Sequence, residues 1–430
     1  MNAPAASNSL PPVVMVAYQC GPGMGSVSQI GWEWFVRTAR LRPLTLVTHV
    51  RNRPALEAQL PWPDGAEVIY IDTEWFAAPL YRLAKWLFPH SEHGVFLVSS
   101  LDFFVFDAMA LRRLKGLKAS RSWCALHLVT PVTLSAPSRL HRLGLPMVWG
   151  PLNCGLESPP GFDRILRHER PWMIRLRELP RALDGWFGTT RHTQVLLTAT
   201  QATRQAVPER HRHRCVALLE NGVDLQRFTP SPWPTPPDAN HPLQVLFVGR
   251  MIALKGVDML LEAVAALREQ GLAVQLTLVG DGPQRGEWEQ TAQKLGLQPQ
   301  VRFTGALAAA EVAAHMQACH VFCLPSVRES GGAVLLEAMA CARPVVAVAY
   351  GGPAEVVDEV VGHPVQATDY AGVVRQLQAV LADVIHHPDD WKRRGLRGLQ
   401  RIKEHHDWNQ KIATAQGLYE LAVSRYHTHG

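Results

Sequence analysis

Long hydrophobic runs and regularly spaced cysteines are both missing from this chain of 430 residues. No stretch approaches the roughly 20 consecutive apolar residues that a membrane-spanning helix needs. The seven cysteines are an odd number, and Cys319 and Cys323 lie in "CHVFCLP", which is typical of a buried strand. The chain does not start with a basic segment and an apolar run. We therefore expect no secretory signal and a reduced, cytoplasmic setting.

A strong excess of charge of one sign is also missing. The 43 Lys and Arg residues against 37 Asp and Glu residues give a net charge of +6, which is spread along the chain. This mild balance suits a phosphate-bearing ligand or an anionic membrane surface. No RNA-binding or helix-turn-helix signature is present, so we do not expect nucleic acid as a partner.

The chain contains apolar strands that alternate with amphipathic helices. In its first half the predicted strands are Val13–Tyr18, Thr45–Val50, Glu67–Ile71, Val95–Ser99, Trp123–Val129 and Val195–Thr198. Several are almost entirely apolar, as strands covered by helices on both faces must be. The pattern predicts an α/β fold with a mainly parallel sheet.

A proline-rich stretch, "TPSPWPTPPDANHP", interrupts this pattern and predicts a stiff, extended linker. Strands resume after it in "LQVLFVGR", "VQLTLVG", "VRFTG", "VFCLP" and "PVVAVAY", and "KGVDMLLEAVAALREQG" predicts a helix that ends at Gly271. We therefore predict a first domain over residues 1–228, a linker over 229–242 and a second domain over 243–400. A C-terminal helix over 401–430 can cross back to the first domain.

Two doubly wound, Rossmann-like domains joined in this way are expected to face each other across a cleft. In such sheets, ligands bind beyond the carboxyl ends of the strands. The functional residues should therefore follow strands directly.

The glycine-rich loop "GPGMGS" after the first strand is the first candidate. Gly21, Gly23 and Gly25 do not fit the G-x-G-x-x-G pattern of a nicotinamide site, because Ser26 stands where the last glycine belongs. The second strand is followed by Arg51 and Arg53 and no acid, which leaves a 2′-phosphate of NADP open. A loop at a helix N-terminus can bring backbone N–H groups near any phosphate, and a plain tight turn stays open as well.

The second domain offers two cations just beyond a strand. Arg250 and Lys255 stand in "FVGRMIALKGVD", with Gly249 and Gly256 beside them. Arginine clamps phosphate oxygens bidentately and lysine adds a point charge, so the pair suits a diphosphate. A basic loop exposed to solvent remains the alternative.

The stretch "LPSVRESGGAVLLEAMACARP" carries two glutamates. Gly331 and Gly332 are expected to open a helix that runs to about Cys341, and its N-terminus favours anionic oxygens. Glu329 precedes this helix and Glu337 lies inside it, within an apolar sequence. A buried carboxylate needs a partner, which sugar hydroxyls or a structural ion pair would supply.

The spacing of these glutamates resembles the E-x7-E signature of retaining glycosyltransferases of family 4, which have the GT-B fold. The flanking motifs "ENGVDLQRF", "KGVD", "VGDGP" and "GGPAEVV" are similar to that family over nearly the whole second domain. The resemblance through the first domain is thinner. It is limited to "HLVTPVTLSAPSRLHRLGLPMVWGPLNCG", which is similar to one branch of the family.

The resemblance implies an enzyme of hexosyltransferase type. It would move a sugar from a UDP- or GDP-sugar to a glycan or lipid-linked acceptor, in cell-surface polysaccharide or glycolipid assembly, with no cofactor and no metal. No D-x-D motif is present. Another GT-B enzyme, such as a sugar-nucleotide epimerase or a phosphorylase, and a non-catalytic sugar-nucleotide-binding scaffold stay open.

The resemblance also implies roles for single residues. The donor diphosphate would meet the loop of Gly249, Arg250 and Lys255. The donor sugar would meet Glu329 and the amides of Gly331, Gly332 and Ala333, and the ribose would meet Glu337. Gly25 would face the phosphates from the first domain, and His127, at a strand end, would lie near the reacting sugar. A satisfied core histidine is the alternative for His127.

Two residues depart from the family pattern. Gly331 stands where an aromatic residue is usual, which leaves the donor sugar open. Ala342 stands where glycine is favoured, and we interpret that position as structural.

Two stretches of the first domain mix arginine with apolar residues, Leu111–Arg121 and Arg164–Phe187. Basic amphipathic helices of this kind can lie on anionic lipid. They indicate peripheral contact with the inner face of the cell membrane, or simply helix faces exposed to solvent.

Overall fold

The computed structural model describes residues 10–89, 92–166 and 183–429. The chain divides into two compact units. Unit 1 comprises Met1–Gly155, Glu169–Glu220 and Lys411–Gly430, and unit 2 comprises Leu156–His168 and Asn221–Gln410. The segment 156–168 and the residues from Asn221 onward thus belong to unit 2, although the predicted first domain ran to residue 228. The last 20 residues belong to unit 1.

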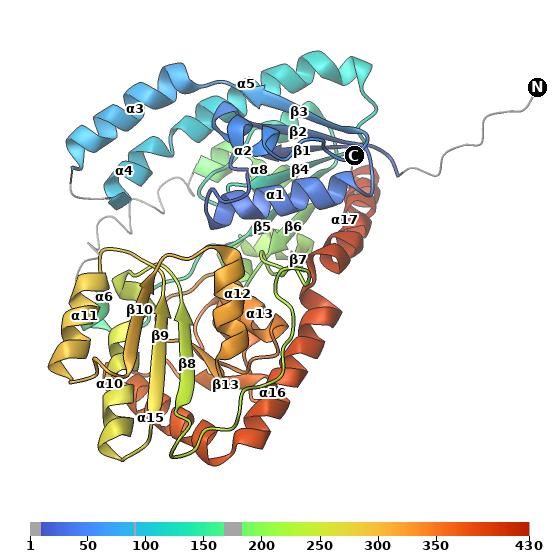
Figure 1. Ribbon diagram of the computed structural model, residues 1–430. Helices are drawn as coiled ribbons and strands as arrows, with labels where there is room; N and C mark the ends of the chain where they lie inside the picture. The colour runs from blue at the N-terminus through green and yellow to red at the C-terminus, as the bar shows by residue number, and fades with distance from the viewer. Residues whose placement is uncertain (1–9, 90–91, 167–182, 430) are drawn as a thin grey trace, which may run out of the picture. The chain divides into compact units, whose positions relative to one another are not determined.

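Unit 1 is built on a parallel sheet with helices on both faces (Figure 1). In the described residues its strands follow the order β3-β2-β1-β4-β5-β6-β7. They are β1 Val13–Ala17, β2 Leu44–His49, β3 Ala66–Ile71, β4 Ala125–Thr130, β5 Met147–Leu152, β6 Val195–Thr198 and β7 Cys215–Ala217. The helices are α1 Ser26–Ala39, α2 Arg53–Glu57, α3 Glu74–Leu87, α4 Glu92–Ser99, α5 Asp102–Leu117, α8 Thr189–His192, α9 Gln201–Ala206 and most of α17 Trp408–His429.

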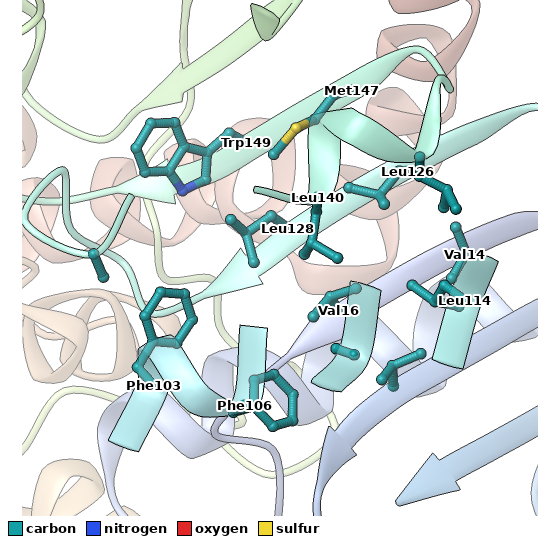
Figure 2. Packing of buried hydrophobic residues seen from close by; sticks show 14 of the residues in the cluster. Val14, Val16, Phe103, Phe106, Leu114, Leu126, Leu128, Leu140, Met147 and Trp149 are labelled. Atoms are coloured by element: carbon teal, nitrogen blue, oxygen red, sulfur yellow. The ribbon is translucent and has the colours of Figure 1, made fainter. Parts of the chain in front are cut away.

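The core of unit 1 lies between α5 and one face of the sheet. Phe103, Phe106 and Leu114 of α5 are buried against strand residues (Figure 2). Side chains alternate between the two faces along a strand, so Leu126 and Leu128 both point toward α5. Every residue of β4, including His127 and Thr130, is buried, as expected for a strand covered by helices on both faces.

Unit 2 repeats the same winding with a smaller sheet. Its described strands follow the order β10-β9-β8-β11-β12-β13, and all neighbours are parallel. They are β8 Leu243–Val248, β9 Val274–Val279, β10 Val301–Gly305, β11 Val321–Leu324, β12 Val345–Val348 and β13 Gly362–Val365. The helices are α6 Asp163–Leu166, α10 Val257–Glu269, α11 Arg285–Lys294, α12 Ala309–Ala318, α13 Ala333–Ala340, α14 Gly352–Val356, α15 Tyr370–His386 and α16 Pro388–Arg401.

The predicted elements agree with these bounds in most places, and one prediction is wrong. Val95–Ser99 was expected to be a strand, but it is part of α4. A short apolar run without a clear period does not separate a strand from a helix, and this one does not pair with the sheet. The sequence pattern missed β5, β7 and β13. The helix predicted to end at Gly271 stops at Glu269, and Gly271 follows with φ 78°, the left-handed conformation that glycine accepts.

The proline-rich stretch 229–242 is anchored on unit 2 by a buried arginine. Arg343 is fully buried, and its Nη2 donates to the backbone oxygen of Pro232 at 2.9 Å and of Gln317 at 2.6 Å. The indole of Trp233 donates to the backbone oxygen of His320 at 2.9 Å. These contacts hold an extended segment that has no regular structure of its own.

Two observations bear on membranes. Within the described ranges, no helix combines the length and the apolar character that a membrane crossing requires. Most of the predicted lipid-facing stretch Arg164–Phe187 lies outside the described residues.

Candidate functional site

Both sheets reverse their strand order at the same relative position. The order runs outward from β1 and β4 in unit 1, and from β8 and β11 in unit 2. Ligands of doubly wound sheets bind at the carboxyl ends of the strands where the order reverses. In unit 2 the loops at this point begin at Gly249, after β8, and at Pro325, after β11.

Glycines bring the loops of unit 2 into backbone contact. Gly280 has φ 132°, and a Cβ placed on it would lie 1.9 Å from the backbone oxygen of Gly249. A Cβ on Gly282 would lie 2.4 Å from the backbone oxygen of Met251. No side chain fits at such distances. The two glycines of "VGDGP" therefore allow the loop after β9 to pack closely against the backbone of the loop that carries Arg250.

The structure brings Lys255 and Glu329 together in an ion pair. The Nζ of Lys255 donates to the carboxylate of Glu329, and the two side chains are 18% and 15% exposed. The backbone N–H of Val327 also donates to the oxygen of Leu254 at 3.0 Å, which ties the two loops together. Arg250 is exposed on the same loop system. A fixed cation and a fixed carboxylate thus stand at the switch point of unit 2.

The loop after β12 holds Glu329 from the other side. Gly352 donates its N–H to the backbone oxygen of Glu329 at 2.9 Å. A Cβ on Gly351 would lie 2.3 Å from that oxygen, and one on Gly352 would lie 2.2 Å from the oxygen of Ser330. The two glycines of "YGGP" therefore allow a close backbone approach that fixes the position of Glu329.

The helix α13 begins immediately after the glycine pair. Gly332 is its N-cap with φ 56°, and no side chain caps the first turn. The N–H of Leu335 in this turn donates to the backbone oxygen of Gly332 at 2.9 Å. The start of a helix favours an anionic group, and contact of a donor sugar with the amides of Gly331, Gly332 and Ala333 stays a prediction.

Glu337 lies in α13 among buried apolar residues. Loss of hydration raises the pKa of its carboxyl to about 7, although the nearby charge of Arg227 acts in the opposite direction. A carboxyl group in this setting gains from a ligand that supplies hydrogen bonds.

His127 does not occupy the predicted position at a strand end. It is the third residue of β4, and it is fully buried. Its Nε2 donates to the backbone oxygen of Gly150 at 2.7 Å, so its Nδ1 accepts from the hydroxyl of Tyr419 at 2.9 Å. Trp34 of α1 packs edge-on against the imidazole ring, and the centres of the two rings are 4.7 Å apart.

The alternation of side chains explains this outcome. His127 lies between Leu126 and Leu128 and points to the sheet face that α1 and α17 cover, opposite to α5. Burial lowers its pKa to about 4. The prediction of a strand-end histidine is therefore wrong, and His127 is a satisfied core residue.

The glycine-rich loop of unit 1 leads into α1. Gly25 is the N-cap with φ 104°, and a Cβ placed on it would meet no atom within 4 Å. Both arginines that could receive a 2′-phosphate are engaged in ion pairs, Arg51 with Glu74 and Arg53 with Glu57. A 2′-phosphate would therefore meet two exposed arginines whose charges are already partly balanced by glutamates.

No sequence pattern singled out Arg328 or Ser158 as a site residue. The Nη1 of Arg328, next to Glu329, donates to the hydroxyl of Ser158 at 2.6 Å. A Cβ on Gly351 would also lie 2.6 Å from a methyl group of Leu156. The segment after β5 thus supports the loops of unit 2. No periodicity marks this segment, so only the folded chain reveals the contact.

Within the part of the chain that the structure describes, no group of three or more His, Cys, Asp or Glu side chains is placed to hold a metal ion. Catalysis without a metal stays a prediction.

The second unit is similar in sequence to known proteins. The family model described as "Glycosyl transferases group 1" matches residues 236–397. The D-inositol 3-phosphate glycosyltransferase of Salinispora tropica is 34% identical over 236 residues, which cover 50% of this chain and 47% of that protein. The GDP-mannose-dependent alpha-(1-6)-phosphatidylinositol monomannoside mannosyltransferase of Mycolicibacterium smegmatis is 34% identical over 183 residues, 38% of this chain and 47% of that protein. The chain thus spans about half the length of these curated relatives.

The whole chain is similar in fold to solved glycosyltransferase structures. The structure of Anabaena HepE in complex with UDP and glucose has a TM-score of 0.59 and 17% sequence identity, and the match covers 95% of this chain and 100% of that one. At this identity the likeness concerns the fold, which is GT-B with two Rossmann-like units.

Proposed function

We propose that this chain transfers a sugar from a nucleoside diphosphate sugar to an acceptor, as the match of residues 236–397 to the glycosyl transferases group 1 family supports. The observation that carries the proposal is the Lys255–Glu329 pair at the switch point of unit 2. In this proposal the lysine binds phosphate and the carboxylate binds sugar hydroxyls, near the N-terminus of α13.

The donor contacts follow from this arrangement. Arg250 and Lys255, with the backbone at Gly249, hold the diphosphate, because both cations stand on the loop after β8. Glu329 and the N–H groups of α13's first turn meet the sugar. The carboxyl of Glu337, raised in pKa by burial, accepts hydrogen bonds from the ribose hydroxyls.

The cations also supply the chemistry. When the bond between the sugar and the diphosphate breaks, the sugar gains oxocarbenium character and negative charge builds on the leaving phosphate. Arg250, Lys255 and the dipole of α13 stabilise that charge more strongly than they stabilise the bound donor. The family resemblance implies retention, and no nucleophile on the far face of the sugar follows from the described contacts. We therefore propose that the acceptor oxygen attacks from the same face as the bond to the diphosphate breaks, and that the leaving phosphate takes the acceptor's proton. An NMR spectrum of the product that shows inverted configuration would contradict this.

The names of sequence relatives and of structures with a similar fold support a UDP- or GDP-sugar as the donor. UDP and glucose accompany Anabaena HepE, and GDP-mannose is named for the mycobacterial mannosyltransferase. The acceptor we propose is a glycan or a lipid-linked sugar of cell-surface polysaccharide or glycolipid assembly.

Thermal unfolding in the presence of nucleotides tests the donor site. We expect UDP or GDP to raise the unfolding temperature of the wild type, since a ligand at 100 times its Kd adds about 2.7 kcal/mol. ADP, NAD and NADP should give much smaller shifts. Arg250→Ala should lose the shift and keep the unfolding temperature of the free protein. A shift with NADP alone that survives in Arg250→Ala would overturn the proposal.

Activity is tested with the nucleotide that gives the largest shift. The wild type should release it from its sugar conjugates only when an acceptor is present, and a glycosylated product should appear. A free epimerised sugar would indicate an epimerase instead. Nucleotide binding without turnover of any donor would indicate a scaffold.

A further inference from the structure

The helix α3 of unit 1 exposes its bulky side chains to solvent. Trp75 is 66% exposed and Trp86 is 76% exposed. Of the large hydrophobic residues found exposed within the described ranges, five lie on this one helix: Trp75, Tyr81, Leu83, Trp86 and Leu87. Surface hydrophobic residues are normally scattered singly, so a concentration on one helix of 14 residues marks an interaction site.

The helix packs through its small residues. Ala77 and Ala84 are buried, and α3 lies against α4 and α5 (Figure 1). A surface helix ordinarily turns its large apolar residues inward. Phe76 and Leu80 are half-buried, but the other five large apolar or aromatic residues of α3 are exposed, so the core of unit 1 does not account for them.

The two tryptophans share one face of the helix. At 100° per residue, Trp75, Pro79, Arg82 and Trp86 form one stripe, and the two tryptophans stand roughly 16 Å apart along the axis. Leu83 and Leu87 flank the stripe on one side. Lys85 flanks it on the other, with its Nζ 5.1 Å from the ring centre of Tyr81.

The charges on this face are cationic. Arg82 and Lys85 are both exposed, and the one acid of α3, Glu74, pairs with Arg51 at the start of the helix. Tryptophan, tyrosine and leucine with arginine and lysine are the composition of helices that lie at a bilayer interface, because the rings enter the headgroup layer and the cations meet anionic lipid. We propose that α3 docks unit 1 on the surface of a bilayer that contains anionic lipid.

A second copy of this chain fits the same face less well. A two-fold contact brings the same patch of both copies together. It would press Arg82 and Lys85 of each copy into one desolvated area without an acid of α3 to pair them, which is costly. Anionic headgroups provide the counter-charge that a second copy lacks.

The stretch Leu111–Arg121, which the sequence predicted to face lipid, differs from α3 in the structure. In Leu111–Arg121, the apolar side chains of Leu111, Leu114 and Leu117 pack on the core of unit 1. That stretch therefore presents cations to solvent and no aromatic anchor. The prediction of an amphipathic lipid-facing helix there is wrong, because its apolar face is already covered.

Vesicle co-sedimentation tests the docking of α3 without reference to the enzymatic activity. The full chain is mixed with vesicles of phosphatidylcholine alone, or with one third phosphatidylglycerol. We expect the wild type to bind the anionic vesicles, and the double variant Trp75→Ser/Trp86→Ser to bind them at least tenfold more weakly. Arg82→Glu/Lys85→Glu should remove the preference for anionic lipid.

Matched controls separate this surface from exposed apolar residues in general. Leu396 is 54% exposed and lies outside α3 and outside both arginine-rich stretches, so Leu396→Ser should bind vesicles like the wild type. All variants should keep the unfolding temperature of the wild type, since the changed side chains are exposed. Equal vesicle binding by the wild type and Trp75→Ser/Trp86→Ser overturns the proposal. A dimer in sedimentation that this double variant dissociates, without any vesicle binding, overturns it in favour of a second copy.

Discussion

The two units share one winding and differ at the point where it reverses. In unit 2 the loops after β8 and β11 carry Arg250, Lys255 and Glu329, and glycines force their backbones into contact. In unit 1, His127 stands within β4, and its two ring nitrogens are bonded inside the core. In our proposal the same fold uses polar groups for a ligand in unit 2 and for stability in unit 1. Arg250, Lys255 and Glu329 lie in loops that follow strands, whereas His127 belongs to a strand.

Removing Lys255 of unit 2 should have the largest effect of the variants considered, and the effect should be on catalysis. We expect Lys255→Ala to lower kcat for sugar transfer roughly 10² to 10³-fold, because the leaving phosphate loses a positioned cation. The measurement is steady-state transfer with the donor found by thermal unfolding. Lys294→Ala, which removes an exposed lysine at the end of α11, is the matched control and should leave kcat unchanged. A loss smaller than threefold in Lys255→Ala would contradict the assigned role.

Removing His127 should affect stability instead. His127→Ala leaves the hydroxyl of Tyr419 and the oxygen of Gly150 without this partner and opens a cavity, so we expect the free energy of unfolding to fall by about 3 to 5 kcal/mol. Tyr419→Phe removes one of these bonds and should cost about 1 to 3 kcal/mol. Denaturant unfolding measures both. Unchanged stability together with a hundredfold loss of transfer would restore the catalytic interpretation of His127.

The pH dependence of stability should also reflect the buried position of His127. Burial lowers the pKa of His127 to about 4, below the ordinary value of 6.5. As the pH falls below about 6.5, the unfolded chain takes up the proton first, so the wild type should lose stability between pH 6.5 and 4. His127→Ala should lose less over that interval. An equal slope in both proteins would assign the acid sensitivity to other groups.

Glu337 should respond in the opposite direction. Its pKa is raised from 4.5 to about 7 by burial, so the unfolded chain releases its proton first as the pH rises. The wild type should lose up to about 3 kcal/mol of stability from pH 4.5 to 7, and the loss then stays constant. Glu337→Gln should remove this loss and be more stable than the wild type at pH 8. It should also bind the nucleotide about tenfold more weakly, measured by calorimetry. Tighter nucleotide binding by the variant would exclude Glu337 as a ribose contact.

The fold could be predicted from sequence more completely than the contacts within the site. Val195–Thr198 matches β6 residue for residue, because an apolar strand covered on both faces leaves an unbroken pattern. The pairing of Lys255 with Glu329 crosses 74 residues, and no local pattern encodes it. His127 was misplaced because β4 runs on to Thr130 and because Tyr419, which covers it, lies 292 residues further along the chain.

The smallest expected effect concerns the switch point of unit 1. A Cβ on Gly25 would meet no atom within 4 Å, in contrast to Gly280, where it would lie 1.9 Å from a backbone oxygen. Gly25→Ala should therefore cost only the backbone strain at φ 104° and ψ 167°, a conformation that essentially only glycine adopts, about 1 to 3 kcal/mol. If a phosphate approaches the start of α1, the added methyl group also occupies part of its room. We expect the nucleotide-dependent rise in unfolding temperature, measured against the free variant, to shrink in Gly25→Ala. An undiminished rise would show that Gly25 serves only as the cap of α1, and the ligand-binding role would then belong to unit 2 alone.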